Sequence, residues 1–215
     1  MNAHPRLKII WENHKSTILV FLLIGILGIG AILYPQKEYP AVPEERLVQD
    51  PFLGPEDAPV TIIEYADFAC SGCKLFHNAK VKEEILALYA GQVKFVWRDN
   101  AHLSSASRAA ANAAQCAYDQ GFFWEYHDLL FDNPIGFSED GLKSYGRMLG
   151  LDSEIFDTCI EEGTYMKKVI YNMNLAGENG LSTTPSFLVN DNIIIGPPSS
   201  SYLSDVISTI LDELD

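Results

Sequence analysis

Cysteines are few in this chain of 215 residues: the four lie at positions 70, 73, 116 and 159. Four are too few to staple a small disulfide scaffold, and a pair of zinc knuckles would need the two-residue spacing twice. Basic residues are also scarce, with 15 lysines and arginines against 29 acidic residues and a net charge of −14. Because phosphate binding requires a basic face, this balance argues against nucleic acid as a partner.

Low-complexity runs are scarce as well, and apolar residues make up 47% of the chain. This composition favours a folded protein over a disordered one. The length suits one well-cored domain with appendages. We therefore expect a single domain.

Charge is absent from residues 16–34, STILVFLLIGILGIGAILY. A helix of this length, rising about 1.5 Å per residue, nearly spans a hydrocarbon core of about 30 Å. We predict one transmembrane anchor here. The preceding residues 1–15 carry three basic side chains and one acidic one, a net +2, so the positive-inside rule places them in the cytoplasm and the rest of the chain outside. The alternative is a cleavable signal peptide, with Gly28 and Gly30 as small residues before the cut.

Residues 35–56 contain several prolines and no apolar periodicity, which predicts an extended linker outside the membrane. The folded domain is expected at 57–215. Alternating and β-branched residues predict strands at 59–65 and 93–97, with a helix over 71–90 between them. Four helical segments follow between 104 and 163. The chain is expected to close with a fifth helix over 164–179, a β-hairpin turning at 191–192, and a helix over 200–214.

The segment FACSGC places Cys70 and Cys73 at the turn from the first strand into the helix. The free N–H groups and the positive dipole end of a helix N-terminus favour the thiolate, which is the form that attacks disulfides. A zinc site would need two further ligands, and only His77 lies at a suitable helical spacing. A disulfide across two residues constrains very little chain. The pattern therefore favours thiol-disulfide chemistry.

Three segments together resemble the DsbA-type branch of the thioredoxin superfamily: TIIEYADFACSGCKLF, QCAYDQGFFWEYHDLLF and TTPSFLVN. The resemblance covers about residues 50–215. It implies an α/β (α+β) thioredoxin fold with a helical domain inserted at about 104–163. It also implies an extracytoplasmic thiol-disulfide oxidoreductase, periplasmic or at the cell surface, that uses no cofactor and no metal.

The resemblance assigns roles to individual residues. Cys70 corresponds to the exposed nucleophile and Cys73 to the buried resolving cysteine. Thr184 and Pro185 correspond to the cis-proline loop that offers backbone groups to an extended substrate. Glu64 corresponds to a buried acid that relays a proton to the resolving cysteine, with a solvated acid as the alternative.

Ser71 and Gly72 depart from the proline and histidine that enterobacterial relatives commonly carry between the cysteines. Lys74 and His77 are candidates to hold the thiolate instead. The departure leaves the direction of electron flow open between an oxidase that forms disulfides in exported proteins and a reductase or isomerase. A less favoured alternative is an anchored metal-binding domain. In either enzyme a membrane redox partner would reset the cysteine pair.

Cys116 and Cys159 both fall in helical segments of the insertion. Two free thiols are unusual in an oxidising compartment, and relatives hold a second disulfide in this block, so we expect a structural disulfide. Buried free thiols and a second redox relay are the alternatives. The aromatic residues of the segment FFWEYHDLLF have the spacing of a core-facing helix, and His127 within it is expected to be structural.

Overall fold

The computed structural model describes residues 37–132 and 135–214. The expected cytoplasmic segment 1–15 and anchor 16–34 lie outside these ranges. Within them, none of the helices has the length and apolar character needed to cross a bilayer. The chain divides into two units, Met1–Glu38 and Tyr39–Asp215, and the fold described below is that of the second unit.

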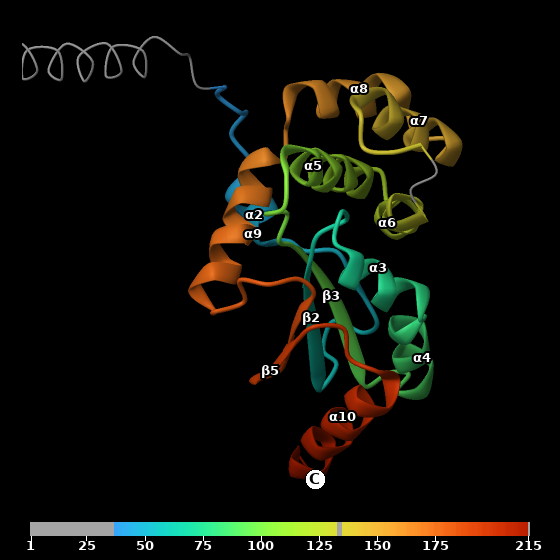
Figure 1. The fold of residues 1–215 in the computed structure, drawn as a ribbon, viewed down its shortest axis with the longest axis vertical. Helices are drawn as coiled ribbons and strands as arrows, with labels where there is room; N and C mark the ends of the chain where they lie inside the picture. Colours follow the sequence, from blue (N-terminus) through green and yellow to red (C-terminus); the bar gives the residue numbers. More distant parts are fainter. Residues whose placement is uncertain (1–36, 133–134, 215) are drawn as a thin grey trace, which may run out of the picture. The chain divides into compact units, whose positions relative to one another are not determined.

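A five-stranded sheet forms the centre of the fold (Figure 1). Its strand order is β1-β3-β2-β4-β5. β2 and β3 are parallel, and every other neighbouring pair is antiparallel. The strands are β1 (Phe52–Leu53), β2 (Val60–Ala66), β3 (Val93–Asp99), β4 (Ser186–Val189) and β5 (Asn192–Ile195).

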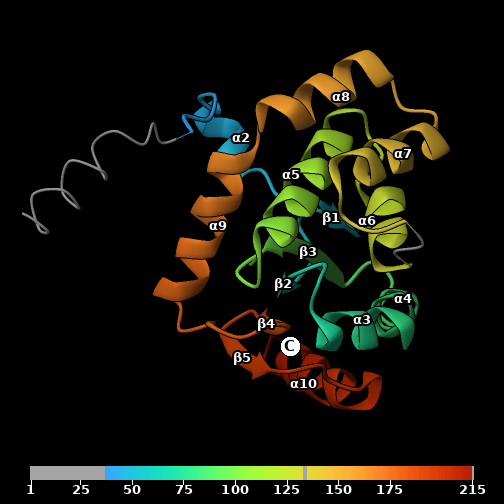
Figure 2. The same ribbon diagram turned by 45° about the horizontal axis from the view of Figure 1, so that its top comes forward.

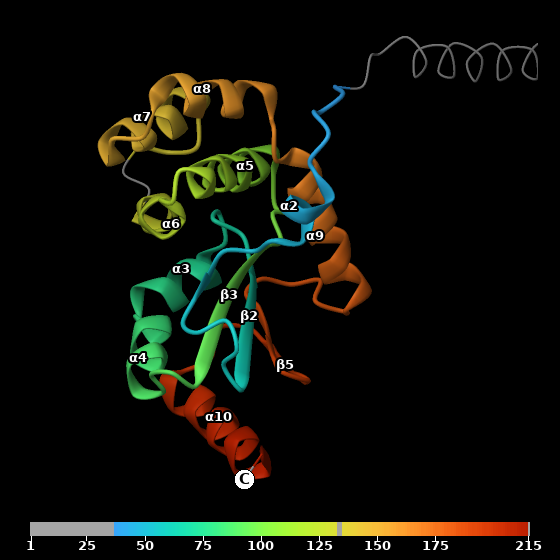
Figure 3. The same cartoon turned by 180° about the vertical axis from the view of Figure 1, so that it is seen from behind.

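Helices cover both faces of the sheet and form an inserted block between β3 and β4. The views of Figures 1, 2 and 3 agree that α9 lies on the opposite side of β2 and β3 from α3 and α4. The helices are α2 (Glu44–Val48), α3 (Ser71–Asn78), α4 (Val81–Leu88), α5 (Ser105–Asp119), α6 (Phe123–Asp132), α7 (Glu139–Leu149), α8 (Ser153–Glu162), α9 (Met166–Glu178) and α10 (Ser200–Leu214). This is the expected thioredoxin-like α/β fold with an inserted helical region.

One apolar core lies between the sheet and the helices α3, α4 and α10. Alternate residues of β2 point into it, because side chains of a strand alternate between faces. The members are fully or almost fully buried: Val60, Ile62, Phe76, Val81, Ile85, Phe95, Phe187, Leu203 and Ile207. Glu64 has the same parity as Val60 and Ile62, so a carboxyl group points to a face that is otherwise apolar.

The helix expected over 71–90 is two helices. Lys80 separates them with a left-handed backbone (φ 56°), and the N–H of Ala79 closes α3 by donating to the Leu75 carbonyl. After this turn, Val81 and Ile85 of α4 are buried in the core. A lysine in this conformation gives no sequence signal for a break, because glycine is the usual residue there.

The segment expected as an extended linker, 35–56, contains α2 and β1. Its structure comes from contacts with distant residues. β1 pairs with β3, and Asp50 Oδ2 accepts a 2.7 Å hydrogen bond from Arg98 Nε in a partly buried ion pair. The folded part of the chain therefore begins before residue 57.

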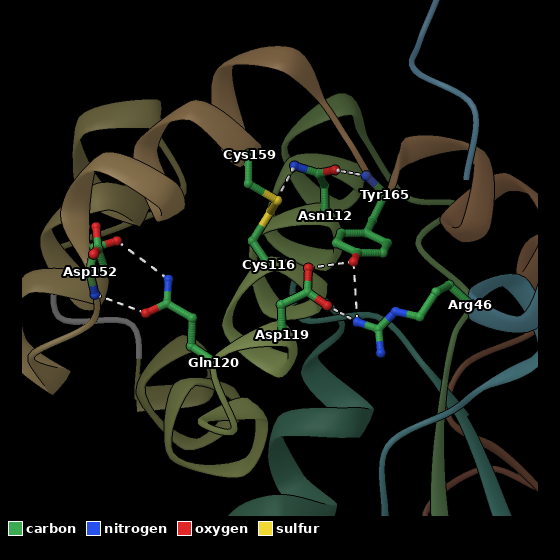
Figure 4. Close-up of a disulfide and its surroundings, with 8 residues drawn as sticks. All are labelled: Arg46, Asn112, Cys116, Asp119, Gln120, Asp152, Cys159 and Tyr165. Atoms are coloured by element: carbon green, nitrogen blue, oxygen red, sulfur yellow. Dashed lines mark hydrogen bonds and ion pairs between the residues drawn. A yellow bond between two sulfur atoms is a disulfide. The ribbon is translucent and has the colours of Figure 1, made fainter. Parts of the chain in front are cut away.

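Cys116 on α5 and Cys159 on α8 form a disulfide, with their Cα atoms 6.0 Å apart (Figure 4). Beside it, the Asn112 side-chain oxygen accepts a 2.8 Å hydrogen bond from the backbone N–H of Tyr165. The Tyr165 hydroxyl contacts Asp119, which forms an ion pair with Arg46 of α2. The disulfide thus lies where α5, α8 and the start of α9 meet.

Removing this disulfide should destabilise the protein without changing the active site. The two cysteines are 43 positions apart, for which the chain-entropy model gives about 4 kcal/mol. We expect the double variant Cys116→Ala/Cys159→Ala to lose about this free energy of unfolding in urea titrations. A loss below about 1 kcal/mol would show that the crosslink does not constrain the unfolded chain as the model requires.

Candidate active site

Cys70 lies at the end of a tight turn that connects β2 to α3. The Asp67 side chain accepts a 2.8 Å hydrogen bond from the N–H of Ala69, and the Asp67 carbonyl accepts one of 2.9 Å from the N–H of Cys70. Cys70 is the N-cap residue of α3. This turn fixes the sulfur at the helix N-terminus.

The two cysteines of the pair differ in exposure. Both are free thiols, but Cys70 is partly exposed and Cys73 is fully buried. Burial, together with the charge of Glu64, raises the pKa of the Cys73 thiol well above its ordinary range. A reagent from solvent therefore meets Cys70 first, and Cys73 lies behind it.

Thr184 and Pro185 lie against the cysteine pair, 114 positions away in sequence. The peptide bond between them is cis. The Cys70 thiol donates a 3.2 Å hydrogen bond to the Thr184 carbonyl. The antiparallel register of β2 and β4, which pairs Tyr65 with Ser186, brings this loop to the N-terminus of α3.

The dipeptide between the cysteines packs closely against the cis-proline loop at its glycine. Ser71 is exposed. A Cβ atom on Gly72 would lie 3.0 Å from Pro185 Cδ and 3.7 Å from Cys70 Sγ. The absence of a side chain at position 72 thus lets the cis-proline loop approach the helix closely.

Glu64 lies in the central strand β2, between Trp97 of β3 and Phe187 of β4. Only 3% of it is exposed. Burial raises its pKa from 4.5 to about 8, although the ammonium of Lys82 acts in the opposite direction. At neutral pH the carboxyl group therefore holds its proton in the folded state, which is the form needed to donate a proton to a thiolate.

The aromatic residues of α6 are mostly core. Phe123, Tyr126 and Phe131 are buried, whereas Phe122 is exposed at the helix start. His127 is also buried, with its ring 4.8 Å from that of Trp97 between centroids, and burial lowers its pKa to about 3. It is therefore a neutral ring in the core.

Of the two side chains proposed to hold the Cys70 thiolate, one is exposed and the other contacts α6. Lys74 is exposed. His77 is buried and contacts His127, Phe131 and Asp128. Sequence reasoning missed Lys82, a lysine that is 6% exposed and acts on the pKa of Glu64. Its position in α4 carries no motif, so only the tertiary structure identifies it.

The fold and the cysteine pair together define a thioredoxin-fold protein with a CxxC site. Comparison with known proteins agrees: a family model described as Thioredoxin matches residues 46–209. A thioredoxin-like oxidoreductase from Silicibacter pomeroyi has a similar structure, with a TM-score of 0.68 and 27% identity over 80% of this chain and 99% of that one.

Two curated relatives differ in how much of their length is matched. Disulfide bond formation protein D from Bacillus subtilis is 28% identical over 67% of this chain and 69% of its own. The Na(+)/H(+) antiporter NhaA 3 from Salinispora tropica is 34% identical over 73% of this chain but only 24% of its own. The chain spans about a quarter of the length of such antiporter relatives. The chain belongs to the thioredoxin family.

The protonation of Glu64 should make stability depend on pH. The unfolded chain releases this proton near pH 4.5 and the folded chain near pH 8. Between these values the folded state binds more protons, so the unfolding free energy falls as pH rises, by at most about 1.4 kcal/mol per unit. Relative to Glu64→Gln, the wild-type protein should lose on the order of a few kcal/mol from pH 4.5 to 8.5 in denaturant titrations.

The matched control is Glu178→Gln, on the exposed side of α9. Its difference from wild type should stay constant across this range. A constant difference for Glu64→Gln as well would show that Glu64 loses its proton at the same pH in the folded and unfolded states.

Proposed function

We propose that this chain catalyses disulfide formation in exported proteins as a membrane-anchored thiol-disulfide oxidoreductase. The observation that carries the proposal is the asymmetric cysteine pair. Cys70 is accessible and hydrogen-bonded to the Thr184 carbonyl, while Cys73 is buried behind it. Such a pair accepts a substrate sulfur at one atom and releases the other as leaving group.

The exchange proceeds in two displacements. A substrate thiolate attacks Cys70 Sγ of the oxidised pair, which forms a mixed disulfide and breaks the bond to Cys73. The departing Cys73 thiolate takes a proton, for which the neutral carboxyl of Glu64 is the donor. The second substrate thiolate then attacks the substrate sulfur of the mixed disulfide and releases Cys70. The substrate gains a disulfide, and the enzyme is left as a dithiol.

Thr184 and Pro185 supply the substrate-binding edge in this proposal. An extended peptide next to Cys70 would use backbone hydrogen bonds at this loop, which is independent of side-chain sequence. A site of this kind suits clients that share only a reactive cysteine. Exported cysteine-containing proteins are such clients.

The sequence and the second disulfide support the location that we propose. The apolar segment 16–34 would anchor the chain, with residues 1–15 in the cytoplasm and the catalytic domain outside. A disulfide between Cys116 and Cys159 is typical of oxidising compartments outside the cytoplasm. A membrane redox partner would then return the cysteine pair to the oxidised state after each cycle.

A reductase or isomerase with the same site is the second candidate. The observation in its favour is Gly72, which leaves no side chain above Cys70 to hold the thiolate of the reduced form. Strong oxidants of this class owe their potential to a stabilised reduced form. A pair without that stabilisation is a weaker oxidant.

The reduction potential of Cys70 and Cys73 distinguishes the two directions. We would equilibrate the full-length protein in glutathione buffers and count alkylated thiols by mass spectrometry. For the oxidase we expect a value of about −120 to −180 mV. A value near about −230 mV or below would contradict the oxidase and favour the reductase. The Cys116→Ala/Cys159→Ala variant is measured in parallel. It contains only Cys70 and Cys73, so its alkylation reports the active-site pair alone.

A further inference from the structure

A cluster of potential metal ligands lies between α3 and α6, outside the cysteine site. It consists of His77 on α3 and His127 and Asp128 on α6, whose ligand atoms all lie within 4.8 Å of one another. Asp128 Oδ1 is 3.7 Å from His77 Nδ1 and 2.9 Å from His127 Nδ1. Among the described residues, no other group of three or more His, Cys, Asp or Glu side chains is placed so that it could hold a metal ion.

His77 presents an unsatisfied nitrogen to this cluster. Its side chain is 4% exposed, and Nδ1 has no hydrogen-bond partner among the described residues. Buried polar atoms nearly always have a partner, so such an atom calls for an explanation. A cation at the centre of the cluster would supply one.

The two imidazole rings are held in place by aromatic packing. His77 stacks on Phe131 with ring centroids 5.0 Å apart, and His127 meets the edge of the same ring at 4.9 Å. The two histidine rings are 5.6 Å apart. Burial lowers the pKa of both rings and so favours the neutral form, which is the form that donates a lone pair to a metal.

We propose that His77, His127 and Asp128 bind a divalent transition-metal ion of the Zn²⁺ type, with water completing the coordination. Two imidazoles and a carboxylate suit zinc, and metal-ligand distances of about 2.0–2.2 Å in a tetrahedron separate ligand atoms by roughly 3.3–3.6 Å. The distance from Asp128 Oδ1 to His77 Nδ1, 3.7 Å, is slightly above this range, and the distance to His127 Nδ1, 2.9 Å, is below it. His127 binds through Nδ1 as the neutral tautomer that carries its proton on Nε2.

Asp128 provides the route of entry, because its side chain is 47% exposed. The ammonium of Lys82 lies 3.9 Å from Asp128 Oδ1 and opposes a second cation. Lys82 also lies 3.5 Å from Glu83 and 4.5 Å from the centre of the Trp124 ring, so it keeps two partners when Asp128 turns to the metal. Lys82 therefore lowers metal affinity without closing the site.

A metal here would join the helix that carries the cysteine pair to the inserted block. His77 is four residues beyond Cys73 on α3, and His127 and Asp128 belong to α6. Binding would stabilise the docking of the insertion on the thioredoxin half, because a ligand that binds only the folded state raises its stability. The site uses neither thiol, so metal binding can be present or absent whether or not the protein catalyses thiol-disulfide exchange.

The test measures binding of Zn²⁺ and Co²⁺ alone. We would use the full-length chain as the Cys70→Ser/Cys73→Ser variant, so that no active-site thiol binds the metal. Isothermal titration should show one equivalent of Zn²⁺, with a rise in Tm, and Co²⁺ should give visible absorption bands of a low-coordinate site. Because the loss of even an outer-shell partner weakens metal sites about 10- to 100-fold, His77→Gln and Asp128→Asn should each weaken binding at least tenfold.

Two further variants, made in the same background, sharpen the result. His102→Gln removes an exposed histidine and should leave the affinity unchanged, whereas Lys82→Gln should increase it by removing the competing charge. Circular dichroism establishes that each variant is folded. The proposal is overturned if no Zn²⁺ binds at millimolar concentration, or if His77→Gln and Asp128→Asn bind as tightly as their parent.

Discussion

The antiparallel pairing of β2 with β4 is the interaction on which the active site depends. It sets the register in which Glu64 faces Phe187 and Tyr65 faces Ser186. That register places the Thr184 carbonyl 3.2 Å from the Cys70 thiol, although the two residues belong to different halves of the fold. A slip of one residue would turn every side chain of β4 to the other face and remove the loop from the cysteines.

The position of the same strand in the sheet also determines the protonation state of Glu64. β2 lies between β3 and β4, where Glu64 is almost fully shielded from water, and its pKa rises to about 8. A neutral carboxyl beneath α3 avoids the cost of a buried charge and leaves a proton close to Cys73. The apolar surroundings that stabilise the fold therefore also prepare the site for proton transfer.

Sequence reasoning was most successful where signals are local. The spacing of Cys70 and Cys73 after an apolar run predicted the strand-to-helix turn, and the helical segments of the insertion were confirmed in order. The break at Lys80 was missed because its left-handed backbone carries no glycine or proline signal. The ordered segment around Asp50 was missed because its structure depends on Arg98, 48 positions away. The grouping of His77 with His127 likewise exists only once α3 and α6 pack together.

The central claim is that the substrate forms its mixed disulfide with Cys70 and not with Cys73, and trapping of that disulfide tests it most directly. A Cys73→Ser variant retains the outer thiol but has no resolving thiol. Incubated with a client peptide activated as a mixed disulfide with a small thiol, it should accumulate a stable covalent complex through Cys70, seen by mass spectrometry and reversed by dithiothreitol. The corresponding Cys70→Ser variant should accumulate none. Equal trapping by both variants would show that Cys73 is as accessible as Cys70, and would contradict the account.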